Sequence, residues 1–232
     1  MKKPYVTAAV LAAGLGTRFG GEETKQRKKL LGKSIVRRAV EIFDSCDIVD
    51  DIIVVMRPDE REFIKEELLG IKKPLKLVEG GKFRAESAKN AFLALNPQAD
   101  YIAIHDAARC ITDIKDVENV IKDAFTYSAA SAACEVFDTV KGIDENGFIN
   151  CTYNRDFIRF VETPQVFSKE LYQKALSEVG ELSADITDDN TLMEKIGVKV
   201  FLTKMQKENV KITTPSDMLY AEFILKGNFS NE

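Results

Sequence analysis

The sequence contains one histidine, His105, and four cysteines that form no C-x-x-C pair. A Ser/His/Asp or Cys/His nucleophile system would have to be built around that single histidine. Because a lone histidine at the end of a strand is more often packed and hydrogen-bonded than catalytic, we do not expect His105 to act as a base. The wide spacing of the cysteines argues against a zinc ribbon and against the disulfide framework of a small secreted domain. The four are Cys46, Cys110, Cys134 and Cys151.

Long apolar runs are missing as well. No uninterrupted apolar stretch approaches the roughly 18 residues that a membrane-spanning helix needs. The basic N-terminus over residues 1–4 leads into a glycine-containing segment instead of a signal cleavage site. We therefore expect a cytoplasmic protein with no membrane partner. The net charge of −4 gives no electrostatic footprint for nucleic acid, so no nucleic-acid partner is expected either.

The most informative stretch that is present covers residues 6–20. An apolar run of strand character ends in glycines at Gly14, Gly16 and Gly20, with Arg18 among them. Small residues before the glycines leave room for a ligand to approach the backbone, and glycine tolerates the positive φ angles that let N–H groups converge on an anion. Such a loop after the first strand of an α/β sheet predicts a phosphate-binding site.

Two common phosphate loops do not match this stretch. The dinucleotide fingerprint G-x-G-x-x-G would need its third glycine at position 19, whereas Gly20 is one residue later. A Walker loop ending in the Gly-Lys-Ser at 32–34 would need a glycine at position 27, which is Arg27. We therefore expect neither a hydride-transfer cofactor nor a Walker-type site. Lysines follow the glycine loop at Lys25, Lys28 and Lys29.

The first half of the chain alternates between segments of strand character and segments of helical periodicity. We expect an α/β fold with a mixed, mostly parallel, Rossmann-like sheet flanked by helices. Ligands bind beyond the carboxyl ends of the strands in such sheets. Loops 14–20, 80–87 and 105–109 should therefore converge on one site. The expected strands are 52–56, 75–78 and 101–104, and the expected helices are 35–43, 58–69, 84–93 and 113–127.

The second half departs from this alternation. A strand over 131–136 is followed by a β-hairpin over 139–153, whose Asn146-Gly147 pair is the strongest short turn signal. Because a two-stranded ribbon is marginal alone, we expect this arm, at about 137–160, to pack on a second subunit in a homodimer. The chain is expected to be a single domain over 1–232. Its last expected elements are helices 169–178 and 188–196, strands 198–202 and 209–213, and a helix beginning at Pro215.

Asp106 ends a buried strand, where an isolated carboxylate would be costly unless it met a cation. Mg²⁺ prefers one or two carboxylates together with phosphate oxygens, so Asp106 is the candidate metal ligand. The competing interpretations are a helix N-cap or an ion pair with Arg109.

A set of short motifs follows in order along the chain, at 12–18, 25–26, 80–87, 105–109, 138–139, Arg155, 163–167, 187–189 and 210–213. One motif alone would be a weak signal, because many nucleotidyltransferases share the glycine loop, but the ordered set is specific. From about Val6 to the C-terminal helix, the chain resembles the 2-C-methyl-D-erythritol 4-phosphate cytidylyltransferase family.

The resemblance implies a nucleotide-diphospho-sugar transferase fold and transfer of CMP from CTP to a sugar-alcohol phosphate, with release of pyrophosphate. Since the nucleophile is a phosphate oxygen, already anionic near neutral pH, no general base is needed, and fixed cations and a metal carry the catalysis. The resemblance implies catalytic roles for Arg18, Lys25, Arg155 and Lys211, with Asp106 holding Mg²⁺. The implied substrate-binding residues are Ala12, Ala13, Gly14, Gly16, Gly81, Ser87, Ala107, Arg109, Thr139, Thr163 and Thr187.

Two departures from the family pattern stand out. After Lys25-Gln26 the family usually has an aromatic or aliphatic pair, whereas this chain continues with Arg27-Lys28-Lys29, so Lys28 and Lys29 compete with Lys25 for the catalytic role. Position 110 is often proline in the family and is Cys110 here. Two alternative functions stay open. One is the activity of ribitol-5-phosphate cytidylyltransferase, a sister family, and the other is that of a non-catalytic nucleotide-binding regulator.

Overall fold

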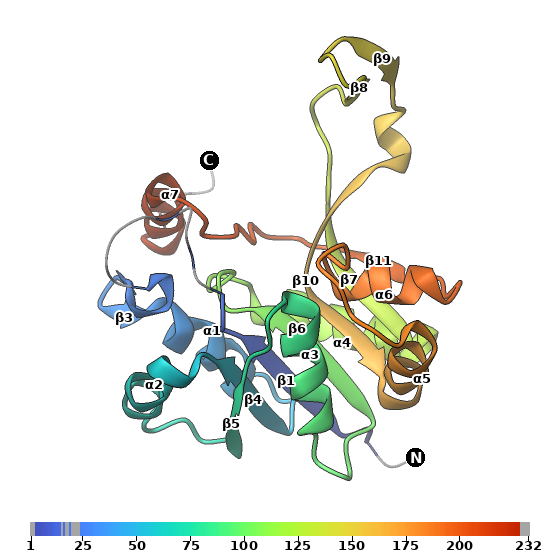
Figure 1. Ribbon diagram of the computed structural model, residues 1–232. Coiled ribbons are helices and arrows are strands. Elements are labelled where there is room, and N and C mark those ends of the chain that lie inside the picture. The colour runs from blue at the N-terminus through green and yellow to red at the C-terminus, as the bar shows by residue number, and fades with distance from the viewer. Residues whose placement is uncertain (1–2, 15, 17–18, 20–23, 228–232) are drawn as a thin grey trace.

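The computed structural model describes residues 3–14, 16, 19 and 24–227. Its centre is a seven-stranded sheet in the order β11-β7-β10-β6-β1-β4-β5 (Figure 1). The strands are β1 (Val6–Leu11), β4 (Asp51–Met56), β5 (Leu75–Glu79), β6 (Tyr101–Asp106), β7 (Ala129–Glu135), β10 (Arg159–Ser168) and β11 (Phe201–Lys204). Strands β4, β5 and β6 run parallel to β1, and only β10 pairs antiparallel with its neighbours. The expected mixed, mostly parallel sheet is confirmed.

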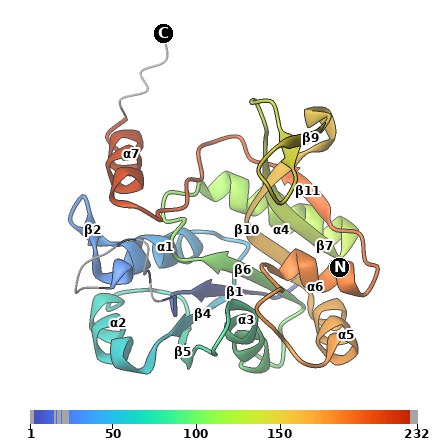
Figure 2. The ribbon, with the colours of Figure 1, turned by 45° about the horizontal axis from the view of Figure 1, so that its top comes forward.

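Helices cover both faces of the sheet (Figures 1 and 2). One apolar cluster packs α1 (Ile35–Asp44), α2 (Arg61–Glu67) and α4 (Ile114–Tyr127) on one face. The other cluster packs α3 (Arg84–Leu93), α5 (Lys169–Val179) and α6 (Asp189–Lys195) on the opposite face. The central strands read as continuous apolar runs because both of their faces are buried.

Several short elements and the C-terminal helix lie around the carboxyl edge of the sheet. A 3₁₀ turn, η2 (Lys25–Arg27), leads into the small ribbon of β2 (Lys29–Leu30) and β3 (Lys33–Ser34). A second 3₁₀ turn, η3 (Pro58–Glu60), precedes α2. The helix predicted over 58–69 is therefore split, and its α-helical part ends at Glu67. The C-terminal helix α7 (Pro215–Leu225) begins with a capping box between Thr214 and Asp217.

The arm (residues 137–160) stands away from the body in Figure 1. It contains β8 (Lys141–Ile143), β9 (Ile149–Thr152) and the 3₁₀ turn η4 (Arg155–Phe157). Its apolar side chains are open to solvent in the single chain, with Phe137 78% and Phe157 85% exposed. The predicted hairpin is confirmed, whereas its packing on a second subunit stays a prediction.

The strand predicted over 209–213 was wrong, because this segment is irregular in the structure. Its polar groups are used across the end of the sheet: the backbone N–H of Ile212 donates to Ala108 O at 2.8 Å, and the Asn209 amide donates to Thr163 O at 2.9 Å. Strand β11 also starts three residues later than position 198, where a strand was expected to begin. Among the described residues, no helix is long and apolar enough to cross a membrane. The cytoplasmic location stays a prediction.

Candidate active site

A pocket of about 500 Å³ opens at the carboxyl edge of the sheet. Its wall is built by the segments that follow β1, β4, β5 and β6, together with η2 and the irregular segment before α7. The three loops that the sequence predicted to converge therefore do meet here. The lining residues are Leu11, Ala13, Gly14, Gly16, Lys25, Gln26, Arg57, Gly81, Lys82, Phe83, Arg84, Ser87, Asp106, Ala108, Lys211 and Thr213.

Asp106 is the only acidic side chain among these lining residues, and two cations flank it. Its Oδ2 lies 2.6 Å from Lys211 Nζ, and its Oδ1 lies 3.1 Å from Arg84 Nε. Burial by itself would raise the pKa of the Asp106 carboxyl, but Arg84 and Lys211 outweigh burial and hold that pKa well below its ordinary value. The carboxylate is therefore ionised at neutral pH. The alternative ion pair between Asp106 and Arg109 is not present.

Arg84 links the pocket to the interior of the domain. Its Nη1 lies 2.6 Å from Oδ2 of Asp189, a fully buried carboxylate at the start of α6. The hydroxyl of Tyr172 on α5 donates to the other Asp189 oxygen at 2.6 Å. One guanidinium thus joins α3, β6 and α6, which fixes the orientation of the Asp106 carboxylate. The sequence placed Arg84 inside a matching motif but gave it no role, because no spacing rule connects it to Asp189.

Lys25 projects from η2 into the pocket wall, and its Nζ donates to Ile212 O at 2.8 Å. Its rivals Lys28 and Lys29 do not line the pocket. The geometry therefore favours Lys25 as the lysine that faces a ligand. Arg18 lies outside the described residues.

Close packing of the backbone shapes the glycine-rich walls of the pocket. Gly16 has φ +65°, in the left-handed region that favours glycine. A Cβ at Gly81 would overlap the Glu86 side chain. The Ser87 hydroxyl accepts from the Gly81 N–H at 3.1 Å and donates to Phe83 O at 3.2 Å, so it ties the 81–83 loop to α3. Ala13 and Gly14 also line the pocket.

Several of the residues predicted to bind substrate lie behind the pocket wall and do not line the pocket. Burial lowers the pKa of His105 to about 4, so the ring is neutral, and it contacts Arg109 O and Thr163 Oγ1 at 3.0 and 3.1 Å. Thr163 Oγ1 also accepts from the Asp106 N–H at 3.1 Å. The Arg109 side chain pairs with Glu162 at 3.4 Å. These residues support Asp106 from behind, and Ala12 and Ala107 are buried beside them.

The predicted residues of the second half lie elsewhere within one chain. Thr139, Arg155 and Thr187 do not line the pocket. Arg155 belongs to η4 of the arm and donates a hydrogen bond to Phe137 O. A single chain therefore does not bring Arg155 to Lys211.

Asp106 has the chemistry expected of a magnesium ligand. The described residues include no group of three or more His, Cys, Asp or Glu side chains that could hold a metal ion. A metal in this pocket would therefore depend on Asp106 together with oxygens of a bound ligand, which is the arrangement that Mg²⁺ adopts with phosphates. An ionised carboxylate in a wall rich in cations and glycines fits that arrangement.

The fold and the pocket define an α/β protein of the nucleotidyltransferase type, with cations gathered beyond the ends of parallel strands. A family model described as "IspD: 2-C-methyl-D-erythritol 4-phosphate cytidylyltransferase" matches residues 6–227. The chain belongs to this family.

Individual relatives agree with the family match. A 2-C-methyl-D-erythritol 4-phosphate cytidylyltransferase of Caldanaerobacter subterraneus subsp. tengcongensis is 37% identical over 224 residues, which cover 95% of this chain and 99% of the relative. One of Pelotomaculum thermopropionicum is 35% identical, over 95% of this chain and 94% of the relative. Among solved structures, the 4-diphosphocytidyl-2C-methyl-D-erythritol synthase of Anaerococcus prevotii superposes with a TM-score of 0.86 at 26% identity, over 97% of both chains.

Proposed function

We propose that this pocket transfers CMP from CTP to 2-C-methyl-D-erythritol 4-phosphate, releasing pyrophosphate and forming 4-diphosphocytidyl-2-C-methyl-D-erythritol for isoprenoid synthesis. The observation that carries the proposal is the Asp106 carboxylate, held between Lys211 and Arg84 where the glycine loop and Lys25 meet. The family match names the same reaction.

The reaction brings one anion to another, so the first task of the pocket is to reduce repulsion. Lys25 and Lys211 line the pocket from segments far apart in the chain. Lys25 Nζ donates a hydrogen bond to the carbonyl of Ile212, the residue that follows Lys211. Fixed cations at this point stabilise the charge that develops on the α-phosphate and on the leaving pyrophosphate. We assign to Lys211 the contact with both the acceptor phosphate and the α-phosphate. Arg18, like Lys25, is assigned to stabilise the transition state and the leaving pyrophosphate.

We assign nucleotide selection to the part of the pocket wall formed by the 81–83 loop. The 81–83 loop is tied to α3 by the Ser87 hydroxyl and by the Glu86 carboxylate, which accepts from the Lys82 N–H at 2.6 Å. A loop held in this way presents its backbone groups in a fixed geometry, which is what discrimination among bases requires. Phe83 adds an aromatic surface to the same wall.

Mg²⁺ would be held by Asp106 and by phosphate oxygens of the nucleotide, and it would supply charge neutralisation there. The Arg84–Asp189 pair keeps Asp106 in place whether or not the ion is bound. We further propose that two chains pair through the arm, so that Arg155 and Thr139 of each chain reach the acceptor site of its partner. The exposed apolar side chains of the arm support this proposal.

The test is a pyrophosphate-release assay with CTP, Mg²⁺ and a panel of acceptors. We expect turnover with 2-C-methyl-D-erythritol 4-phosphate and little with ribitol 5-phosphate or N-acetylneuraminate. Preference for ribitol 5-phosphate would assign the chain to the sister activity. Binding of CTP without pyrophosphate release from any acceptor would indicate a regulator instead of an enzyme.

A further inference from the structure

The turn that carries Lys25 is too short to hold its own position. Element η2 has three residues and two turn hydrogen bonds, Arg27 N to Thr24 O and Lys28 N to Lys25 O, each 3.1 Å long. Isolated 3₁₀ turns of this length have poor hydrogen-bond geometry and depend on tertiary contacts. The contacts that fix η2 therefore decide where the Lys25 ammonium group points.

A single carboxylate provides such contacts on both sides of Lys25. Glu60, at the end of η3, is only 3% exposed. Its Oε1 accepts from the Thr24 hydroxyl at 3.1 Å, and its Oε2 lies 2.8 Å from Arg27 Nε. Because Thr24 and Arg27 bracket the turn, Glu60 anchors it at both ends to the segment that follows β4.

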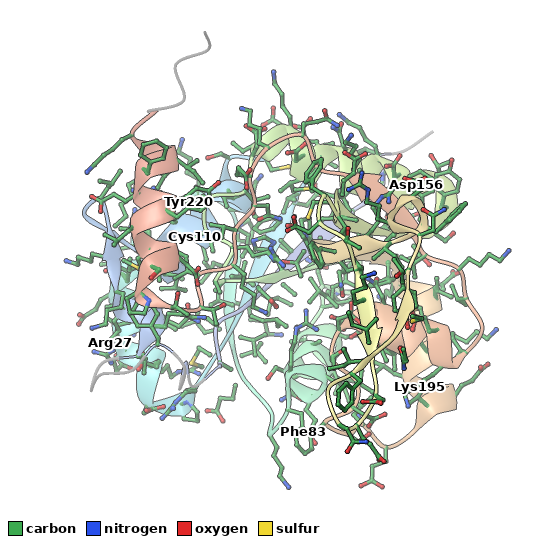
Figure 3. The ribbon with its side chains drawn as sticks, turned by 90° about the horizontal axis from the view of Figure 1, so that it is seen from above. Arg27, Phe83, Cys110, Asp156, Lys195 and Tyr220 are labelled. Carbon is green, nitrogen blue, oxygen red and sulfur yellow. The ribbon has the colours of Figure 1, made fainter. Side chains whose placement is uncertain are left out.

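Arg27 makes a second contact on the same side. Its guanidinium carbon lies 4.5 Å from the centre of the Phe63 ring on α2, in cation–π geometry. A buried carboxylate such as Glu60 needs a cationic partner, and Arg27 supplies it. Arg27 thereby couples the turn to η3 and α2 together. In Figure 3 its label lies on the side of the body that carries α7, away from Asp156 of the arm.

Arg27 meets both partners through the same charged group. Its guanidinium carbon lies over the Phe63 ring while its Nε contacts the Glu60 carboxylate. Of the three basic residues at 27–29, Lys28 and Lys29 are the rivals of Lys25 for the catalytic role, whereas Arg27 is bound to Glu60 and Phe63 beside the turn.

We propose that Arg27 is a positioning residue: with Glu60 and Phe63 it fixes η2 so that Lys25 faces the triphosphate. The proposal rests on the proposed function, in which Lys25 stabilises the leaving pyrophosphate. Arg27 itself does not line the pocket, so its effect on the reaction passes through Lys25.

The test compares Arg27→Met with the wild type in pyrophosphate release at saturating CTP and acceptor. Methionine is similar in length but uncharged, so it removes both the ion pair with Glu60 and the cation–π contact with Phe63. We expect kcat to fall about 10- to 100-fold, the scale of a small misplacement of a catalytic group, with the KM for CTP little changed. Arg27→Lys, which keeps a charge near Glu60, should recover part of the loss.

The decisive experiment uses the double variant Lys25→Ala/Arg27→Met. If Arg27 acts through Lys25, the double variant is no slower than Lys25→Ala alone. If the two losses multiply, Arg27 acts independently and the proposal is overturned. Amide hydrogen exchange gives a readout without activity: Arg27→Met should speed exchange at the N–H groups of residues 27 and 28. Unchanged exchange there would also overturn it.

Arg37→Met is the matched control, since Arg37 on α1 is another arginine bonded to a glutamate, with Nε 2.9 Å from Glu41. It should lower the unfolding temperature without lowering kcat. An equal loss of kcat in this control would reduce the Arg27 effect to general destabilisation and overturn the proposal. A wild type that releases no pyrophosphate would overturn the proposed function, and the exchange measurement would still decide whether Arg27 holds the turn.

Discussion

Lys211 Nζ and Asp106 Oδ2 lie 2.6 Å apart although 105 positions separate the residues in the chain. The pair joins the end of β6 to an irregular segment that no sheet hydrogen bonds hold. Asp106 has Arg84 as a second cationic partner, so the carboxylate would keep a cation beside it if Lys211 turned toward a phosphate. The pair can therefore open on substrate binding without leaving a buried charge alone.

The first prediction concerns Lys211. Lys211→Met should lower kcat at least about 10²-fold, the usual effect of removing one preorganised charge-stabilising group. The unfolding temperature should change little, because Arg84 still pairs with Asp106. Lys204→Met is the control, since Lys204 forms an exposed pair with Glu135 at 2.9 Å and should keep full activity. Pyrophosphate release and thermal unfolding check both variants, and normal turnover by Lys211→Met would contradict the assignment.

The second prediction separates the three lysines after the glycine loop. Lys25→Ala should lower kcat at least about 10²-fold, whereas Lys28→Ala and Lys29→Ala should stay within a few-fold of wild type because neither side chain lines the pocket. Steady-state kinetics of the three variants under identical conditions provide the measurement. A silent Lys25→Ala beside a crippled Lys28→Ala or Lys29→Ala would show that the catalytic position had been assigned wrongly.

The third prediction concerns Arg84 and the buried Asp189. Arg84→Met leaves the Asp189 carboxylate without its cation, and breaking a buried pair in this way costs about 3–5 kcal/mol. Urea unfolding should show that loss, and adding Asp189→Asn should recover part of it. The surface pair of Arg57 with Asp59 gives the stability control, since losing an exposed pair should cost far less than losing a buried one. Equal losses in the two variants would refute the buried-pair interpretation.

The fourth prediction is a pH dependence of stability. Burial lowers the pKa of His105 to about 4 in the folded chain, against an ordinary value near 6.5. Above pH 6.5 the ring is neutral in both states, and between pH 6.5 and 4 the unfolded chain binds the extra proton. Stability should therefore fall by about 3 kcal/mol as pH drops through this window. His105→Gln should flatten the unfolding free energy there, and an unchanged slope would contradict the prediction.

The sequence predicted the sheet and the pocket because both follow from local patterns. Apolar runs of strand length and helical periodicity define β4, β6 and α1, and the rule that ligands bind beyond strand ends brings Gly14, Gly81 and Asp106 to one edge. The irregular path of 209–213 was missed, since its alternating residues look like a strand while its hydrogen bonds go to Ala108 and Thr163.

Side-chain networks were the least predictable part of the site. Nothing in the spacing of Arg84 and Asp189, or of Arg27 and Glu60, indicates that they meet. Each pair forms because two elements pack against each other, and no local pattern in the sequence indicates that packing. The resemblance to a family pointed to the residues at the pocket, but the contacts that hold them come from the tertiary structure.

The last prediction concerns the arm. Its aromatic residues include Phe157, which is 85% exposed in the single chain, and exposed apolar patches mark protein–protein contacts. If the arms of two chains pack against each other, Arg155 of each chain can reach the acceptor phosphate in the active site of its partner. A guanidinium group there can form two parallel hydrogen bonds to phosphate oxygens. Sedimentation should then show a dimer. Arg155→Ala should raise the KM for the sugar-alcohol phosphate or lower turnover while leaving CTP binding intact.

Mixing two impaired variants gives the sharpest form of this test. A chain with Arg155→Ala and a chain with Lys211→Ala should regain some activity together, because one site of the mixed dimer receives Lys211 from one chain and Arg155 from the other. The control is a mixture of two batches of Arg155→Ala, which should gain nothing. A fully active monomer, or a mixture that stays inactive after proven subunit exchange, would rule out a site shared between chains.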